Sequence, residues 1–165
     1  DWEKVSLTPT LHTGVRQGDE DDAHPKYKKP VGERMANVAL AVLYGQGEQE
    51  KVLAPAPVDF AYDATGVTIT FDHVGAGLKL AQGEELLGFE LIKDAVATPA
   101  RATITGVNTV RVEGVENPQG VRYAFYQAAS QSIANLVDDG GLPCPTFADG
   151  SEAQTIPQIN WGVMD

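Results

Sequence analysis

The sequence predicts a mixed fold, in which a loop and one amphipathic helix precede an all-β antiparallel sandwich. Two observations lead to this prediction. Apolar residues recur at helical spacing between residues 30 and 44, and they alternate every second residue from Val58 onward. In addition, the predicted helix has no sheet of its own in this chain to cover its apolar side. We therefore expect residues 1–50 to belong to a larger unit.

The helix is expected over residues 30–44. Pro30 suits the first helical turn, where its missing N–H is not needed, and Gly45 is a natural residue just beyond the last turn. The apolar residues form a single stripe, which consists of Val31, Met35, Val38, Ala39, Val42 and Leu43. An isolated helix of about 15 residues is marginal in water, so this stripe needs a partner surface.

A linker is expected over residues 51–57, because the sequence Ala54-Pro55-Ala56-Pro57 is stiff and extended. Six segments with strand character follow, separated by Gly, Asn and Pro turn signals. These segments cover residues 58–62, 67–71, 88–92, 102–105, 109–113 and 120–126. Short strands at this spacing, without helical segments between them, predict a sandwich domain over residues 58–165, which ends in an irregular tail from Ala128.

The composition disfavours several classes of partner. Twelve Lys and Arg against 23 Asp and Glu give a net charge of −11, which repels nucleic acid and anionic lipid. No apolar run approaches the roughly 20 residues that span a bilayer, and the chain contains no signal-peptide pattern. Cys144, the single cysteine, lies between two prolines and is expected to be a buried apolar filler. Too few His and Cys residues cluster to predict a metal site.

His24 is the candidate for chemistry. It precedes the predicted helix, and Asp22 and Asp21 lie two and three residues before it. A carboxylate this close can accept the Nδ1–H of the imidazole and leave Nε2 facing a nucleophile. Neither His12 nor His73 has such a setting. On the residues alone, a solvated acidic loop is the other interpretation.

Several segments, taken in order along the chain, match one family of enzymes. Residues 24–34 read H-P-K-Y-K-K-P-V-G-E-R, and the later matching segments are residues 71–78, 87–91, 117–125, 135–136 and 141–147. They resemble the motifs of sialate O-acetylesterases, which are carbohydrate esterases of the SGNH hydrolase superfamily. The order and spacing of the matches run over most of the chain, from about residue 18 to residue 147.

The resemblance implies a fold and an activity. Residues 1–50 would be the C-terminal loop and helix of an α/β SGNH-hydrolase domain, and the enzyme would hydrolyse O-acetyl esters on sugars without a cofactor. His24 would be the catalytic base. Asp21 has the spacing to the histidine that is typical of the superfamily, whereas Asp22 aligns with the family's acid, so both are candidate partners of His24. The family also implies a secreted or periplasmic protein.

The chain departs from the family in one major respect. The family's nucleophilic serine lies in a "G-Q-S-N"-type block, and neither this block nor the oxyanion-hole blocks occur here. Ser130-Gln131-Ser132 is superficially similar, but it lies in a late part of the family pattern and is interpreted as a variant loop. We therefore expect the serine on a second chain or in a missing N-terminal segment, and a chain that is inert alone.

Two alternatives remain open from the sequence. The sandwich could be a non-catalytic carbohydrate-binding or interaction module, in which aromatic side chains form a sugar platform; the candidates are Tyr62, Tyr123, Phe125, Tyr126 and Trp161. Alternatively, the esterase could act on acetylated xylan or pectic sugars rather than on sialic acid. No substrate-binding residue is assigned from the sequence.

Overall fold

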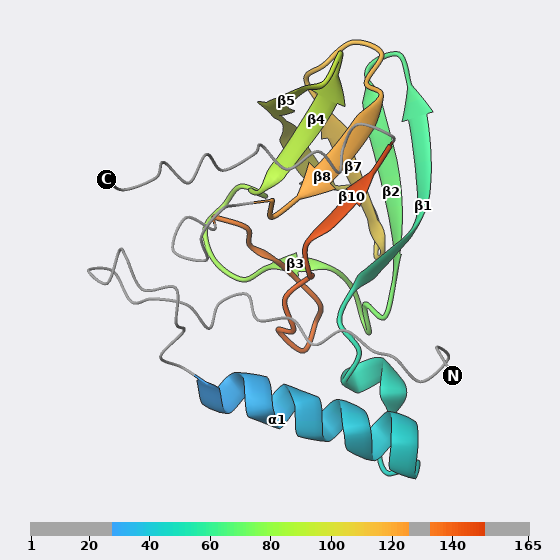
Figure 1. The fold of residues 1–165 in the computed structure, drawn as a ribbon, viewed down its shortest axis with the longest axis vertical. Coiled ribbons are helices and arrows are strands. Elements are labelled where there is room, and N and C mark those ends of the chain that lie inside the picture. Colours follow the sequence, from blue (N-terminus) through green and yellow to red (C-terminus); the bar gives the residue numbers. More distant parts are fainter. Residues whose placement is uncertain (1–27, 126–132, 151–165) are drawn as a thin grey trace, which may run out of the picture.

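The computed structural model of the chain describes residues 28–125 and 133–150. It contains a helical region at its start and a larger part built from β-strands (Figure 1). Figure 1 shows helix α1 beyond the ends of the strands and not against the face of either sheet. None of the described helices is long and apolar enough to cross a membrane.

Helix α1 spans Lys28–Val38, and the π-helical turn η2 continues it over Ala39–Leu43. Gly45 follows with a positive φ of 64°, the left-handed conformation that commonly ends a helix. This confirms the predicted helix and its stop. A short 3₁₀ turn, η3 (Gln49–Lys51), comes next.

Eight strands form two antiparallel sheets of four. The first sheet has the order β1 (Ala56–Asp63), β2 (Gly66–Asp72), β7 (Thr109–Glu113) and β6 (Arg101–Ile104). The second has the order β10 (Phe147–Asp149), β8 (Gly120–Tyr123), β4 (Phe89–Lys93) and β5 (Val96–Pro99). Two further strands, β3 (Lys79–Leu80) and β9 (Leu136–Val137), pair with each other.

The core lies between the two sheets, because alternate residues of each strand point inward. The first sheet contributes Val67, Ile69, Phe71, Val110 and Val112, and the second contributes Phe89, Leu91, Val121 and Tyr123. Phe147 of β10 contacts four other rings at centroid distances of 5.6 to 6.2 Å. The strands therefore form two facing layers with one shared core, and the predicted β-rich domain is confirmed.

All six predicted strands are present, with small shifts at their ends. The segment predicted over residues 120–126 is a strand only as far as Tyr123, because Ala124 has a positive φ of 55°. Four strands were not predicted: β3, β5, β9 and β10. Strands β3, β9 and β10 have only two or three residues, which is too short for an alternating pattern to show, and β5 has four residues that end in Pro99.

The segment expected to be a linker, residues 51–57, is packed in part. Ala54 and Pro55 are buried, and β1 already begins at Ala56, which pairs with Asp72 of β2. The division into domains at this segment stays a prediction, as does the α/β character of the unit to which residues 1–50 belong.

Candidate functional site

The three predicted catalytic residues, His24, Asp21 and Asp22, lie outside the described residues, and their roles stay predictions. The described structure begins at Lys28, four residues after His24. Helix α1 is described from that residue onward. Ser130 and Ser132 also lie outside the described residues.

The early turns of α1 carry two kinds of charged side chain. Lys29 and Glu33 form an exposed ion pair, with Nζ 3.6 Å from Oε1. Arg34, ten residues after His24, is half-buried, and burial lowers the pKa of its guanidinium group. A half-buried arginine keeps its charge, so it provides a fixed cation on the helix that follows the predicted loop.

Asn135 organises a loop of the sandwich, residues 81–87. The Asn135 side chain is buried; its Oδ1 accepts a hydrogen bond from the Leu87 N–H at 2.9 Å. Its Nδ2 donates to the carbonyl oxygens of Gln82 at 3.0 Å and Glu85 at 2.8 Å. Its own carbonyl accepts from the Ala81 N–H at 2.8 Å. Four contacts from one residue therefore fix both ends and the middle of this loop.

Two hollows lie beside this loop. The larger, of about 490 Å³, lies between the loop and strand β6; apolar side chains such as Leu80, Leu86 and Ala102 line it together with Glu84 and Arg101. The smaller, of about 380 Å³, is lined by Gln82, Ile133 and Asn135 among others. The hydrogen bonds of the Asn135 side chain are already used within the loop. Glu84, Glu85 and Arg101 thus supply charged groups to the hollows, but no buried polar group among their lining residues is free to bind a ligand.

Arg122 and Glu90 form a partly buried ion pair on neighbouring strands β8 and β4. The Arg122 Nε donates to Glu90 Oε2 at 2.7 Å. The guanidinium also lies over the Phe125 ring, 5.1 Å from its centroid, an arrangement in which the ring face attracts the cation. Both strands pair in register at these two residues, so this cluster stabilises the pairing of the sheet.

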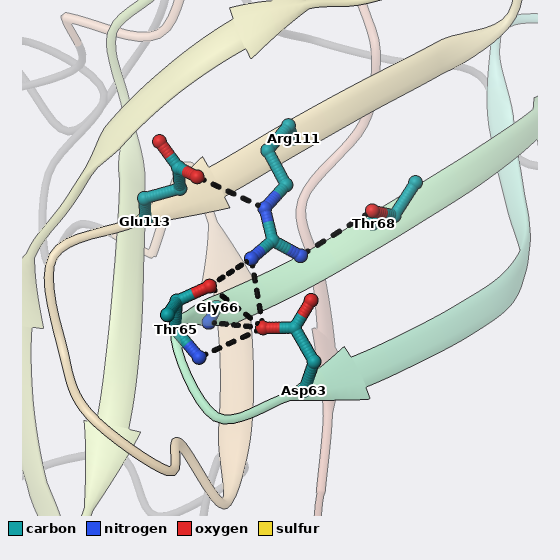
Figure 2. Close-up of polar contacts among 6 residues, drawn as sticks. All are labelled: Asp63, Thr65, Gly66, Thr68, Arg111 and Glu113. Atoms are coloured by element: carbon teal, nitrogen blue, oxygen red, sulfur yellow. Dashed lines mark hydrogen bonds and ion pairs between the residues drawn. The ribbon is translucent and has the colours of Figure 1, made fainter.

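The largest polar network among the described residues surrounds Arg111 on β7 (Figure 2). Its guanidinium donates to Asp63 Oδ1 at 2.8 Å and Thr65 Oγ1 at 2.6 Å, while its Nε donates to Glu113 Oε1 at 3.2 Å. Asp63 accepts hydrogen bonds from Arg111 and also from the N–H and hydroxyl of Thr65; the Arg111 bond first, and then the two from Thr65, lower the pKa of the Asp63 carboxyl well below its ordinary value. A carboxylate held this firmly in its charged form is a poor proton acceptor at neutral pH, so the network is structural.

Two further residues with reactive side chains, His73 and Cys144, have structural roles. His73 has a positive φ of 57°, and its Nδ1 lies 3.2 Å from Glu50 Oε2. Cys144 is fully buried, as expected, and burial raises the pKa of its thiol, so it is not an available thiolate. Within residues 28–125 and 133–150, no three His, Cys, Asp or Glu side chains gather closely enough to hold a metal ion.

The described aromatic residues contribute mainly to the core. Tyr123 is buried, and its hydroxyl accepts a hydrogen bond from the Leu136 N–H at 2.8 Å. Tyr62 is partly exposed on β1 and donates to Asp149 Oδ2 at 2.7 Å. Phe125 is covered by Arg122. Tyr126 and Trp161 lie outside the described residues, so the described part shows no row of exposed rings suited to a sugar.

Comparison with known proteins places the chain near one class of enzyme. Neither family models nor curated proteins match it. Among solved structures, it is similar to a novel carbohydrate acetylesterase from Xanthomonas citri, with a TM-score of 0.72 and 29% sequence identity. The match covers 84% of this chain and 31% of the other, so the chain spans about a third of that protein's length. The likeness supports a relation to carbohydrate esterases, but not to the sialate subfamily in particular.

Residues of the segments that carry the sequence resemblance lie in the core of the structure or hold its loops in place. Phe71, Val121 and Phe147 belong to the core or pack against it, and Asn135 holds the loop 81–87. Sequence reasoning missed the roles of Asn135 and Arg111. The sequence signal for Asn135 was its place in a matching segment, whereas nothing in the sequence pointed to Arg111.

Proposed function

We propose that this chain is part of a carbohydrate O-acetylesterase that uses a Ser-His-Asp mechanism, with the serine outside the chain. The observation that supports the proposal most is the likeness to a carbohydrate acetylesterase at 29% identity over 84% of the chain. The agreement of the motif at residues 24–34 with an esterase family adds to it. The chain spans only part of its structural neighbour, which is compatible with a catalytic unit completed by another segment.

In the proposed reaction the serine Oγ attacks the acetyl carbonyl while His24 Nε2 takes the hydroxyl proton. Asp21 or Asp22 accepts the Nδ1–H and orients the imidazole. The tetrahedral intermediate then expels the sugar hydroxyl, which receives the proton from His24, and water hydrolyses the acetyl-serine in a second step. The proposed substrate is an O-acetylated sialic acid, the enzyme is secreted or periplasmic, and no cofactor takes part.

A fluorophosphonate probe tests the proposal directly, because it labels an activated serine. We expect the assembled protein to label on a serine outside these 165 residues, and the chain alone to remain unlabelled. Labelling at Ser130 or Ser132 would contradict the proposal. For substrate class, release of acetate from O-acetylated sialic acid is compared with release from acetylated xylan.

His24→Ala should lower the acetylesterase activity of the assembled protein by roughly 10⁴-fold or more, because the serine loses its proton acceptor. His73→Ala is the matched control, since the structure places that histidine in a turn beside Glu50. It should leave the activity within about threefold of the unchanged protein. Equal losses in both variants would remove His24 from the proposed role.

A further inference from the structure

Three charged side chains line the larger hollow beside the loop 81–87. Glu84 and Glu85 belong to the loop and Arg101 to strand β6, and all three are exposed. None of them forms a side-chain hydrogen bond or an ion pair with another described residue. By contrast, the arginines of strands β7 and β8 are both ion-paired. Groups of both signs therefore remain available at this hollow.

The loop has a fixed position relative to β6. The Asn135 side chain binds three of its backbone groups, and a bridge between Leu86 and Ala102 joins the loop to the strand. A loop fixed in this way has little conformational freedom left to lose when a ligand binds. The two carboxylates and the guanidinium are thus carried by a rigid frame, although the side chains themselves are exposed.

The same hollow has an apolar part, to which Leu80, Leu86 and Ala102 contribute. Its volume of about 490 Å³ lies within the range of ligand pockets, roughly 300–1,000 Å³. A carboxylate only accepts hydrogen bonds and a guanidinium only donates them. A matching ligand therefore has groups that do both, together with an apolar surface that covers the leucines. An uncharged sugar unit combines these features, because hydroxyl groups donate and accept and one face of the ring carries C–H groups.

We infer that the larger hollow binds an uncharged sugar unit of the glycan that the esterase deacetylates, an inference that rests on the proposed function. The carboxylates of Glu84 and Glu85 and a net charge of −11 disfavour a sugar that carries its own carboxylate, such as sialic acid or a uronic acid. The site thus holds a neutral neighbour of the acetylated sugar and contributes to binding of the glycan.

The smaller hollow extends the site beyond one sugar unit. It shares Glu84, Glu85 and Leu87 with the larger hollow. Its lining also includes Ile133, whose side chain is 55% exposed. Two adjoining hollows along one loop suit a ligand that is itself a chain, so we expect an oligosaccharide to bind more tightly than a single sugar.

Calorimetric binding of unacetylated oligosaccharides tests the inference, because a ligand without esters is not consumed. The protein is the assembled form, in which these residues are together with the polypeptide with which they co-purify or are continuous. The probes are two neutral tetrasaccharides, one of xylose and one of alternating galactose and N-acetylglucosamine. We expect at least one of them to bind with a Kd of about 1 mM or lower.

Variants locate the binding. The double variant Glu84→Ala/Glu85→Ala and the single variant Arg101→Ala should each raise the Kd of that probe at least about fivefold, because each removes hydrogen bonds to hydroxyl groups. Glu116→Ala is the matched control, since this exposed glutamate lines neither hollow. It should leave the Kd within about twofold.

Three results would overturn the inference. Neither neutral probe binds at about 10 mM, both site variants bind the probe as tightly as the unchanged protein, or a tetrasaccharide of galacturonic acid binds more tightly than the neutral probes. The last comparison uses the unchanged protein alone, so it is independent of how the variants fold.

Steady-state kinetics separate the inference from the proposed function. On the acetylated glycan, the two site variants should raise KM about fivefold, because the site contributes to binding and not to the chemical step. Hydrolysis of 4-nitrophenyl acetate, an ester without a sugar, reports on the proposed function alone. Ester hydrolysis with an unchanged KM for the glycan in both variants refutes only the sugar site. Binding of a neutral probe without hydrolysis of any ester refutes the proposed function.

Discussion

At the scale of single residues, Asn135 has the strongest structural role among the described polar side chains. It is buried, and its amide group satisfies one N–H and two carbonyl oxygens of the loop 81–87. Buried polar groups must be hydrogen-bonded, because an unpaired one loses its interaction with water without replacement. The loop therefore takes its shape from a residue about 50 positions later in the chain.

Asn135→Ala should lower the free energy of unfolding by about 2–4 kcal/mol, because it leaves the Leu87 N–H and the loop carbonyls without partners. Urea unfolding followed by fluorescence measures the change. Asn37→Ala, at an exposed position of α1, should change the unfolding free energy by no more than about 0.5 kcal/mol. A loss below about 1 kcal/mol in the Asn135 variant would show that water replaces the amide.

At the scale of elements, the hairpin of β1 and β2 shows why a polar cluster need not be a functional site. Asp63 Oδ1 accepts from the Thr65 N–H at 2.7 Å and from the Gly66 N–H at 3.1 Å, which closes the turn between the strands. Arg111 of β7 then binds the same oxygen. Gly66 is required here, since an added Cβ would meet the backbone carbonyl of Val112. The cluster thus joins three neighbouring strands.

The hairpin also gives the fold a dependence on pH. Interactions with Arg111 and Thr65 lower the pKa of Asp63 below its unfolded value of about 3.9. The contribution of this carboxylate to stability is therefore present above about pH 4 and is lost as the pH falls through the folded-state pKa. Asp63→Asn should be less stable than the unchanged protein near neutral pH, because it lacks the ion pair with Arg111.

The difference in unfolding free energy between the two proteins should shrink as the pH falls from about 5 to about 2.5. Urea titrations at several pH values measure this difference. A difference that stays constant over this range would contradict the role assigned to the ionised carboxylate. Asp59→Asn is the control, because it removes a negative charge from the same strand and leaves the turn contacts of Asp63 unchanged.

The elements differ in how well the pattern of apolar residues predicts them. The helix over residues 30–44 and six of the strands were predictable, because apolar residues recur at regular spacing in each of these segments. Strands β3, β9 and β10 were not, since two or three residues contain no period, and neither was β5, which ends at Pro99. The stripe on the helix was identified correctly as apolar. Which part of it is buried depended on tertiary contacts, and Met35 and Leu43 lie on the exposed part.

At the scale of the whole molecule, the two sheets are joined along both sides. On one side the chain passes from β5 of the second sheet to β6 of the first through Ala100, whose N–H donates to the Phe89 carbonyl at 3.0 Å. On the other side, Tyr62 of β1 donates to Asp149 of β10 at 2.7 Å. These contacts join the two layers at edges where no strand of one sheet pairs with a strand of the other.

A double-mutant cycle with Tyr62→Phe and Asp149→Ala measures that second contact. We expect a coupling free energy of about 0.5–1 kcal/mol, at the low end for a hydrogen bond to a charged group because the pair is partly exposed. Chemical unfolding of the two single variants and the double variant provides the values. Additive effects within about 0.3 kcal/mol would show that the two sheets are held by their shared core alone.

From the sequence, the candidate site is predicted only as a group of residues around His24, and these residues lie outside the described part of the chain. The motif indicated the base and two possible acids, because catalytic loops preserve residue type and spacing. The structure describes the chain only from Lys28, at the start of α1, so the roles of these residues stay predictions. It also showed that the other segments of the resemblance provide packing, such as Phe147 among four aromatic rings.

The sequence by itself determined the helix, the longer strands and the candidate histidine, because each depends on residues that are close together in the chain. Only the tertiary structure decided the roles of Asn135 and Arg111, since all their side-chain partners except Glu113 lie more than 40 positions away. The same holds for the exposure of Met35 and Leu43 on the helix. Spacing along a helix identifies apolar residues, but the surfaces that fold around the helix determine which of them remain available to a partner.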